Sequence, residues 1–490
     1  MKKTKFVAVA AAALMAATTI GTLAGCADKS HTIRVYLLTN SMEREVYTEY
    51  FKDLETKINE ELEEQGLEGY KIEFSGDEVD TYYEKLDGDI TQHATPDVFY
   101  LRPNEILQYK KSIVSVQSYV DANTGLLDGV YKKAIDMYRY DPSTGRLGNP
   151  EDELYAFPKD LSTQQLGYNR TLLEAYEQVI TQLPAHFTGG KMKMPWDLGA
   201  NETYTWNEYL EINKTIAGRQ DLKPEGVKGN VIGCDIPDIE ILAHSFAVAE
   251  GIENYSLVDL SDGRANGKVA SIDKDSPLYK AIEYQAKLAA SGGADHASAK
   301  YSDFTGGNVC FYGAVGSWEV ADYNDKIGDG KWEVMPWPTV NGDANWYGLI
   351  KSAGYVISAD CAKYPEKADI AMRIASSFLS PETQDLLVRV KQITIPILSE
   401  VQEDYLDPTR TEYKPASRKI FIDVISGEHG FFPATYSTYN TVWLDQLTNK
   451  LADMWVAGGK GSAAQTFFNN TDWNDIHSQM QKQYDNDKNK

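Results

Sequence analysis

Cysteine and histidine are scarce in this chain, which narrows the chemistry open to it. Its 490 residues include 4 Cys and 7 His. No CxxC, HExxH or HxH spacing occurs, so a zinc site has few ligands to draw on. No GxSxG segment marks a catalytic nucleophile either. The sequence therefore predicts no metal, no cofactor and no recognisable catalytic centre.

Positive charge is also in short supply. Against 72 acidic residues there are 48 basic ones, a formal net charge of −24. Such a field repels nucleic acid and anionic lipid, and no basic stripe stands out to overcome it. Nucleic acid is therefore not expected as a partner.

One long uncharged run is present, at the N-terminus. It follows Lys2, Lys3 and Lys5, extends over residues 6–25 and ends in Leu-Ala-Gly before Cys26. A membrane span is the alternative, but the run is mostly Ala, Thr and Gly, which suits a cleaved signal peptide better. Leu-Ala-Gly-Cys resembles the bacterial lipobox. We expect residues 1–25 to be a lipoprotein signal peptide, Cys26 to carry lipid, and residues 26–31 to form a tether.

This reading predicts a place for the mature protein. It lies on the extracytoplasmic face of the cell membrane and touches that membrane only through its lipid. The three remaining cysteines are too few for a disulfide framework.

Strand and helix patterns alternate in the first hundred mature residues. Apolar residues alternate in HTIRVYLLTN, recur every four residues over 41–65, and return in KIEFSG and DVFYL. This β-α-β-α-β order predicts an α/β fold with mainly parallel sheets flanked by helices. ITIPIL, residues 393–398, also reads as a strand. Ligands collect beyond the carboxyl ends of such strands, here the loops 40–43, 100–104 and 317–318.

Aromatic residues are abundant: 9 Trp, 31 Tyr and 15 Phe. Any one of them is most simply explained by core packing. Trp318 and Trp346, however, lie in Gly- and Asn-rich turns, where a ring beside polar groups suits the apolar faces and hydroxyl edges of a sugar. We expect residues 309–315 to form a central buried strand and Ser317 to cap the helix after it, which places Trp318 at the rim of a cleft.

Six segments in order resemble one family over nearly the whole mature chain. They are TPDVFYLRPNEILQYKKSIVSVQSYVD, YAFPKDLSTQQLGYNRTLLEAY, TWNEYLEINKTI, GGNVCFYGAVGSW, YGLIKSAGYVIS and YPEKADIAMRIASSFLSPETQ. The chain resembles the family 1 extracellular solute-binding proteins of bacterial ABC transporters, the maltose-binding-protein-like group. The resemblance implies two α/β lobes, a ligand cleft between them and closure about hinges. It also implies no catalysis, a monomer, a carbohydrate ligand and the permease subunits of an ABC importer as partners.

The same resemblance implies how the lobes and the site divide along the chain. Lobe 1 comprises 32–161 and 348–405, and lobe 2 comprises 162–347 and 406–490, with crossovers near 158–163, 347–352 and 400–410. Pro103 stands where many relatives have an acidic residue, so the sugar is expected to differ from maltodextrin. The implied ligand-binding residues are Trp318, Trp346, Tyr100, Arg102, Asp160, Ser162, Glu43, Asn40, Tyr436 and Phe432.

Two alternatives stay open at this point. The same fold could bind a polyamine, iron, a glycerophosphodiester or a peptide, since an acidic chain rich in aromatics suits a cation. A surface glycoside hydrolase is the other, because 72 acids make chance carboxylate pairs abundant.

Overall fold

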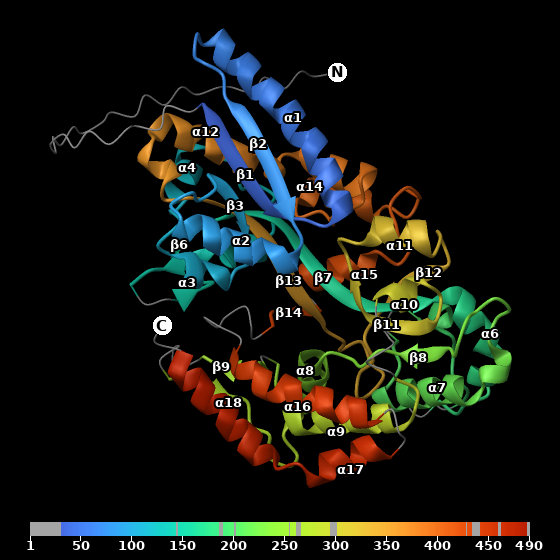
Figure 1. The fold of residues 1–490 in the computed structure, drawn as a ribbon. Coiled ribbons are helices and arrows are strands. Elements are labelled where there is room, and N and C mark those ends of the chain that lie inside the picture. The colour runs from blue at the N-terminus through green and yellow to red at the C-terminus, as the bar shows by residue number, and fades with distance from the viewer. Residues whose placement is uncertain are drawn as a thin grey trace.

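The fold is taken from a computed structural model of the chain, shown in Figure 1. It describes residues 31–143, 146–185, 190–199, 202–253, 255–260, 266–294, 301–427, 429–433, 442–458 and 462–487.

A single sheet of nine strands runs through the molecule. Its strands follow the order β2-β1-β3-β13-β7-β11-β8, with β12 pairing on β7 and β14 on β13. The parallel pairs β1–β2 and β1–β3 confirm the predicted β-α-β-α-β start. The strands of this sheet are β1 Thr32–Leu38, β2 Lys71–Asp77, β3 Val98–Leu101, β7 Phe157–Asn169, β8 Ile232–Cys234, β11 Val309–Gly316, β12 Trp332–Met335, β13 Gly348–Ile357 and β14 Gly430–Phe431.

Two small antiparallel sheets lie apart from the main one. One contains β4 Arg139–Asp141, β5 Arg146–Leu147 and β6 Glu153–Leu154, and the other contains β9 Val258–Asp259 and β10 Lys268–Val269.

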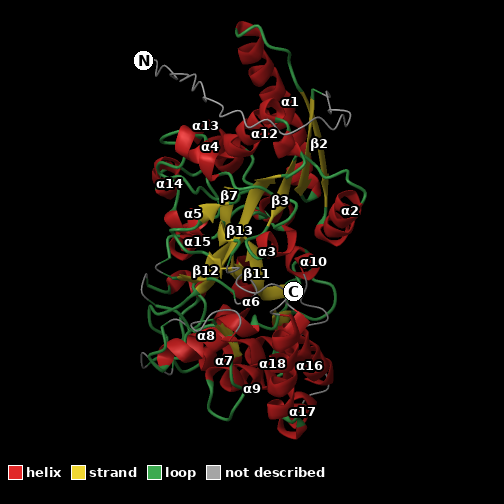
Figure 2. Ribbon diagram, turned by 90° about the vertical axis from the view of Figure 1, so that its left-hand side faces the viewer, coloured by secondary structure: helices red, strands yellow, loops and turns green. Residues whose placement is uncertain are grey.

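Helices surround the sheet and form a separate layer at the C-terminal end, as Figure 2 shows. They are α1 Ser41–Glu64, α2 Val79–Thr91, α3 Glu105–Tyr109, α4 Gln117–Ala122, α5 Lys132–Asp136, α6 Arg170–Ile180, α7 Trp206–Gly218, α8 Ile239–Ala249, α9 Pro277–Ala290, α10 Tyr301–Thr305, α11 Val320–Lys326, α12 Pro365–Ser376, α13 Pro381–Asp385, α14 Ser399–Leu406, α15 Lys419–Ile425, α16 Val442–Gly458, α17 Ala463–Asn470 and α18 Trp473–Asp487.

Strands β7 and β13 connect the two halves of the molecule. The first part of β7 pairs antiparallel with β13, from Phe157 against Tyr355 to Gln164 against Leu349. Its second part pairs instead with β11 and β12. At about 3.3 Å per residue, the 13 residues of β7 are long enough to reach from one half into the other.

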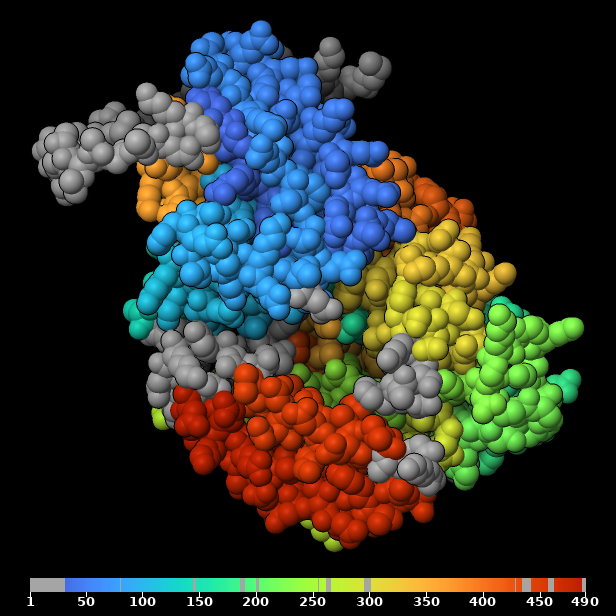
Figure 3. Space-filling model, viewed as in Figure 1, coloured from blue at the N-terminus to red at the C-terminus, as the bar shows by residue number. Residues whose placement is uncertain are grey.

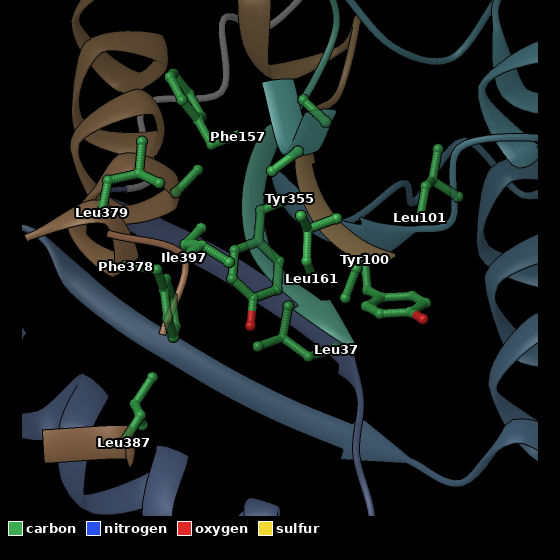
Figure 4. Close-up of a cluster of buried hydrophobic side chains, with 14 of the residues drawn as sticks. Leu37, Tyr100, Leu101, Phe157, Leu161, Tyr355, Phe378, Leu379, Leu387 and Ile397 are labelled. Carbon is green, nitrogen blue, oxygen red and sulfur yellow. The ribbon is translucent and has the colours of Figure 1, made fainter. Parts of the chain in front are cut away.

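The apolar side chains form two separate cores, and the change from one to the other falls inside these same two strands. Leu161 belongs to the first core and Leu166 to the second, while Ile350 and Leu349 are divided in the same way. Figure 4 shows part of the first core, where Tyr355 of β13 lies among side chains from other elements. The crossing strands are therefore held by buried side chains on both sides.

The change of core falls between Leu161 and Leu166 and between Leu349 and Ile350, close to the predicted crossovers near 158–163 and 347–352. Residues 413–425, placed with lobe 2 by the sequence division, supply Tyr413, Phe421 and Ile425 to the first core. The lobe boundaries themselves stay a proposal.

One predicted strand is wrong. Residues 393–398 are buried but form no strand, and Pro396 among them lacks a backbone N–H for a ladder. The Ile397 N–H donates to the side chain of Gln384 instead, at 3.2 Å.

Candidate ligand-binding site

The surface is hollowed between the N-terminal half and the C-terminal helices. Figure 3 shows this hollow below the blue α1–β3 region and above the red helices α16 and α18, with gold atoms of the β13 region at its floor.

Lys351 of β13 and Trp318, in the turn between β11 and α11, lie together. The Lys351 Nζ atom is 5.8 Å from the centroid of the Trp318 ring, and the amine donates to Gln164 Oε1 of β7. The indole lies directly against the Gly316 backbone, where an added Cβ would come within 2.6 Å of its Cε2 atom. The glycine before the turn thus makes room for a tryptophan that remains partly exposed.

Charged groups at the ends of three elements, β3, α8 and α11, act on Lys351. Burial lowers the pKa of Lys351 to about 8; the carboxylates of Asp238, Glu240 and Glu319 act to raise the pKa, and the guanidinium of Arg102 acts to lower it. Asp238 and Glu240 begin α8, and the Asp238 carboxylate accepts from the Glu240 N–H at 2.7 Å. The arrangement offers cations, carboxylate acceptors and an aromatic ring within one site.

Tyr100 and Arg102 border the site at the end of β3. The Arg102 guanidinium lies 5.7 Å from the centroid of the Tyr83 ring, and its backbone N–H donates to Glu105 Oε2 at 2.6 Å. Burial raises the pKa of Tyr100 to about 12, which keeps its hydroxyl protonated. Arg102 therefore acts on Lys351, whereas Tyr100 is buried next to Arg102.

Asn40 and Glu43 have structural roles at the start of α1. The Asn40 side chain accepts from the Glu43 N–H at 2.8 Å, and Glu43 Oε2 accepts from the Asn40 N–H at 3.0 Å, forming a capping box. The second Glu43 oxygen accepts from Lys159 Nζ at 3.1 Å. Both partners of this ion pair are buried.

Asp160 and Ser162 are likewise buried, in the crossing strand β7. Asp160 Oδ1 accepts from the Ala353 N–H at 3.2 Å, and Oδ2 lies 3.5 Å from Lys159 Nζ. Burial raises the pKa of Asp160. The structure thus places these predicted contacts inside the crossover rather than on its surface.

Ser317 does not cap the helix that follows it, and that prediction is wrong. The helix begins at Val320, after Glu319. The Ser317 hydroxyl instead accepts from the Thr163 N–H at 3.2 Å, while the Ser317 N–H donates to the Thr163 carbonyl at 3.1 Å. Ser317 therefore ties the Trp318 turn to β7. The predicted buried strand before it is confirmed as β11, between β7 and β8.

A cavity of about 1040 Å³ continues the site toward β14. Its aromatic wall contains His244, Tyr347, Phe431 and the predicted residue Phe432, and Lys133 of α5 lines it from the first half of the chain. His244 stacks on Phe431 with ring centroids 4.0 Å apart. Its Nδ1 donates to the Tyr255 carbonyl at 3.2 Å, and its buried Nε2 has no hydrogen-bond partner.

Trp346 lies behind this wall. Its ring stacks on His429 with centroids 4.2 Å apart and is 5% exposed, so little of it faces the cavity. Tyr436 and Cys26 fall outside the described residues. Of the predicted residues, Trp318 and Arg102 thus lie near Lys351, Tyr100 is buried next to Arg102, and Phe432 lines the cavity.

Sequence reasoning missed Lys351, Asp238, Glu240 and His244. A lone lysine inside the apolar strand GLIKSAGYVI was a signal for Lys351. Asp238 follows β8, a strand of three residues that is too short to show periodicity. The sequence therefore does not mark Asp238 as a residue beyond the end of a strand.

Within the described ranges, no group of three or more His, Cys, Asp or Glu side chains could hold a metal ion. Cys234, Cys310 and Cys361 are free and buried. No helix in the part of the chain that the structure describes is long and apolar enough to cross a membrane.

The sequence was compared with protein-family models and with curated proteins. A model described as bacterial extracellular solute-binding protein matches residues 57–414. No curated protein matches the sequence.

Solved structures show the same fold. An ABC substrate-binding protein from Listeria monocytogenes in complex with cycloalternan gives a TM-score of 0.60 at 15% identity, over 93% of this chain and 98% of that one. Maltose-bound MalE3 of T. maritima gives 0.61 at 15% identity, over 92% and 98%. The sugar-binding protein MalE from Xanthomonas citri gives 0.59 at 16% identity, over 94% and 97%. These likenesses confirm the predicted two-lobed α/β fold.

Proposed function

The chain belongs to the bacterial extracellular solute-binding proteins, and we propose that it captures a carbohydrate in the cleft between its lobes and delivers it to an ABC importer. Membership in this family places it outside the cytoplasm, as a binding protein. The sugar, the importer and the absence of catalysis are parts of the proposal.

The observation that carries the proposal is the surroundings of Trp318. Its partly exposed ring lies beside the Lys351 amine, and three carboxylates and a guanidinium act on that amine. A sugar presents apolar C–H faces to a ring and hydroxyls to charged acceptors and donors, so this combination suits it. The solved structures in complex with cycloalternan and with maltose support the same class of solute.

A thermal-shift and tryptophan-fluorescence screen tests this proposal on the mature chain. We expect at least one oligosaccharide to raise the melting temperature, and Trp318→Ala to weaken its binding about tenfold or more, since an aromatic contact contributes roughly 0.5–1.5 kcal/mol beyond the area it buries. Trp346→Phe is the matched control, because that buried ring lies behind the cavity wall.

The screen also contains a polyamine, a ferric chelate, a glycerophosphodiester and a peptide. Binding of one of these in place of every sugar would show that the solute class is wrong. Labelled products appearing on incubation with oligosaccharides would show that the protein is an enzyme.

Anchoring by lipid at Cys26 is the remaining part of the proposal, and it rests on the Leu-Ala-Gly-Cys sequence. We expect the wild-type protein to be found with the membrane fraction and to incorporate labelled palmitate. Cys26→Ser removes the thiol that would carry the lipid, so the label should be lost. Equal labelling of the two proteins would contradict a lipid anchor at this residue.

A further inference from the structure

In the part of the chain that the structure describes, two partly buried lysines lack the carboxylate partners that the buried lysines have. Lys159 and Lys367 are the lysines among the buried residues, and each lies next to a carboxylate, Glu43 at 3.1 Å and Asp97 at 3.0 Å. Lys351 and Lys133 are partly buried and have no carboxylate within ion-pair distance among the described residues. In a chain with 72 acidic and 48 basic residues, unpaired amines at buried positions are unexpected.

The Lys351 amine has one neutral partner. It donates to the Gln164 side-chain carbonyl, and the Trp318 ring lies near it. The carboxylates of Asp238, Glu240 and Glu319 influence it from beyond ion-pair distance, and the Arg102 guanidinium is a second cation facing it. A partly desolvated ammonium held this way is costly unless an anion completes its shell.

The Lys133 amine is in a comparable position at the other end of the site. It lies 6.0 Å from the centroid of the Phe432 ring and lines the cavity of about 1040 Å³. Burial lowers its pKa, and among the described residues no carboxylate acts against that effect.

The chain itself connects the surroundings of the two amines. Tyr347 lines the cavity and lies four residues before Lys351, about 13 Å along an extended chain at 3.3 Å per residue. Glu240 and His244 are one turn apart on α8, and His244 contacts Tyr347 with ring centroids 4.7 Å apart. A linear ligand that follows β13 from Trp318 reaches the cavity that Lys133 lines.

We propose that the ligand is an acidic oligosaccharide, whose carboxylate or sulfate groups pair with Lys351 and Lys133 while its hydroxyls donate to Asp238 and Glu240. This inference rests on the proposed carbohydrate-binding function and narrows it. A polyamine would meet both lysines as like charges, and a neutral sugar would leave both without a counter-ion.

The test compares acidic probes with their neutral counterparts by calorimetry. The probes are linear trisaccharides of galacturonate, glucuronate and mannuronate with their methyl esters, and sulfated galactose oligosaccharides with their desulfated forms. We expect an acidic probe to bind at least tenfold more tightly than its neutral form, with an affinity that falls as salt rises.

Lysine variants then show which amines bind the acidic groups of the probe. Lys351→Met and Lys133→Met should each weaken binding of the acidic probe about tenfold or more, and each should weaken binding of the neutral form by a clearly smaller factor. Lys132→Met is the matched control, because Lys132 is next in sequence but exposed and pairs with Asp136. Without ligand, Lys351→Met should raise the melting temperature, since it removes an unpaired ammonium.

The possible results separate the two proposals. Tightest binding of a neutral oligosaccharide, or equal binding of an acid and its ester, overturns this inference and leaves carbohydrate capture in place. A lower melting temperature of unliganded Lys351→Met also overturns it, because the amine would then have an internal partner. If no carbohydrate of either kind binds, both proposals fail.

Discussion

His244 shows how a single side chain is set by its surroundings. It lies one turn after Glu240 on α8, and it is buried among Phe431, Tyr347 and the Tyr255 carbonyl. Burial lowers the pKa of His244 to about 4, so the ring is neutral at pH 7 and its buried Nε2 carries a lone pair.

The same shift predicts an acid-sensitive stability. The unfolded chain binds a proton at His244 near pH 6.5, whereas the folded chain binds it only near pH 4. Protonation therefore favours the unfolded state as pH falls from 6.5 to 4, and the effect is absent above 6.5. Between pH 6.5 and 4 the unfolding free energy of His244→Phe should therefore fall by up to about 3 kcal/mol less than that of the wild type.

Urea unfolding at pH 7.5 and pH 4.5 measures the difference. At pH 7.5 the difference in unfolding free energy between the variant and the wild type reports what the lost Tyr255 contact costs. At pH 4.5 this difference should shift in favour of the variant. Parallel pH profiles would show that His244 titrates normally in the folded protein.

At the scale of elements, the start of α1 is joined to the crossing strand β7. Glu43 closes the capping box of the helix with one oxygen and accepts from Lys159 of β7 with the other. Lys159 also lies 3.5 Å from Asp160, so three charged side chains are buried at this junction. A residue implied as a ligand contact thus has a structural role in the unliganded protein.

Two substitutions at Glu43 separate its roles. Glu43→Gln keeps the capping box, since glutamine also serves at this position, but it removes the charge beside Lys159 and should cost up to about 3 kcal/mol of unfolding free energy. Glu43→Ala also loses the bond from the Asn40 N–H to the side chain and should cost about 1 kcal/mol more.

Denaturant titration of the two variants checks this order. Weakened sugar binding by Glu43→Gln without a loss of stability would instead make Glu43 a direct ligand contact.

At the scale of the whole molecule, two cores meet along β7 and β13, and the ligand site lies over the same strands. Leu161 and Leu166 of β7 lie five residues apart and belong to different cores. The surroundings of Lys351 contain groups from both halves, among them Arg102 and Trp318. A ligand that contacts both halves has higher affinity for a closed arrangement and shifts the molecule toward it.

Small-angle scattering tests this closure. The radius of gyration should decrease when a saturating oligosaccharide is added, and it should stay unchanged for Trp318→Ala at the same ligand concentration. An unchanged radius in the wild type, with binding shown by calorimetry, would mean that capture occurs without closure.

The sequence by itself determined the local structure and the class of fold. Alternation in residues 32–38 and the four-residue spacing over 41–64 are local patterns, and β1 and α1 follow them. The wrong strand prediction at 393–398 also has a local explanation, because a proline interrupts the hydrogen-bond ladder that the apolar pattern suggested.

Only the tertiary structure decided which side chains share the site. Trp318 and Trp346 looked alike in sequence, but one is partly exposed against Gly316 and the other is buried on His429. Lys351, Asp238 and Arg102 come from β13, α8 and the end of β3, far apart along the chain. Periodicity records what one element buries, whereas exposure and charge partners depend on which distant elements pack against it.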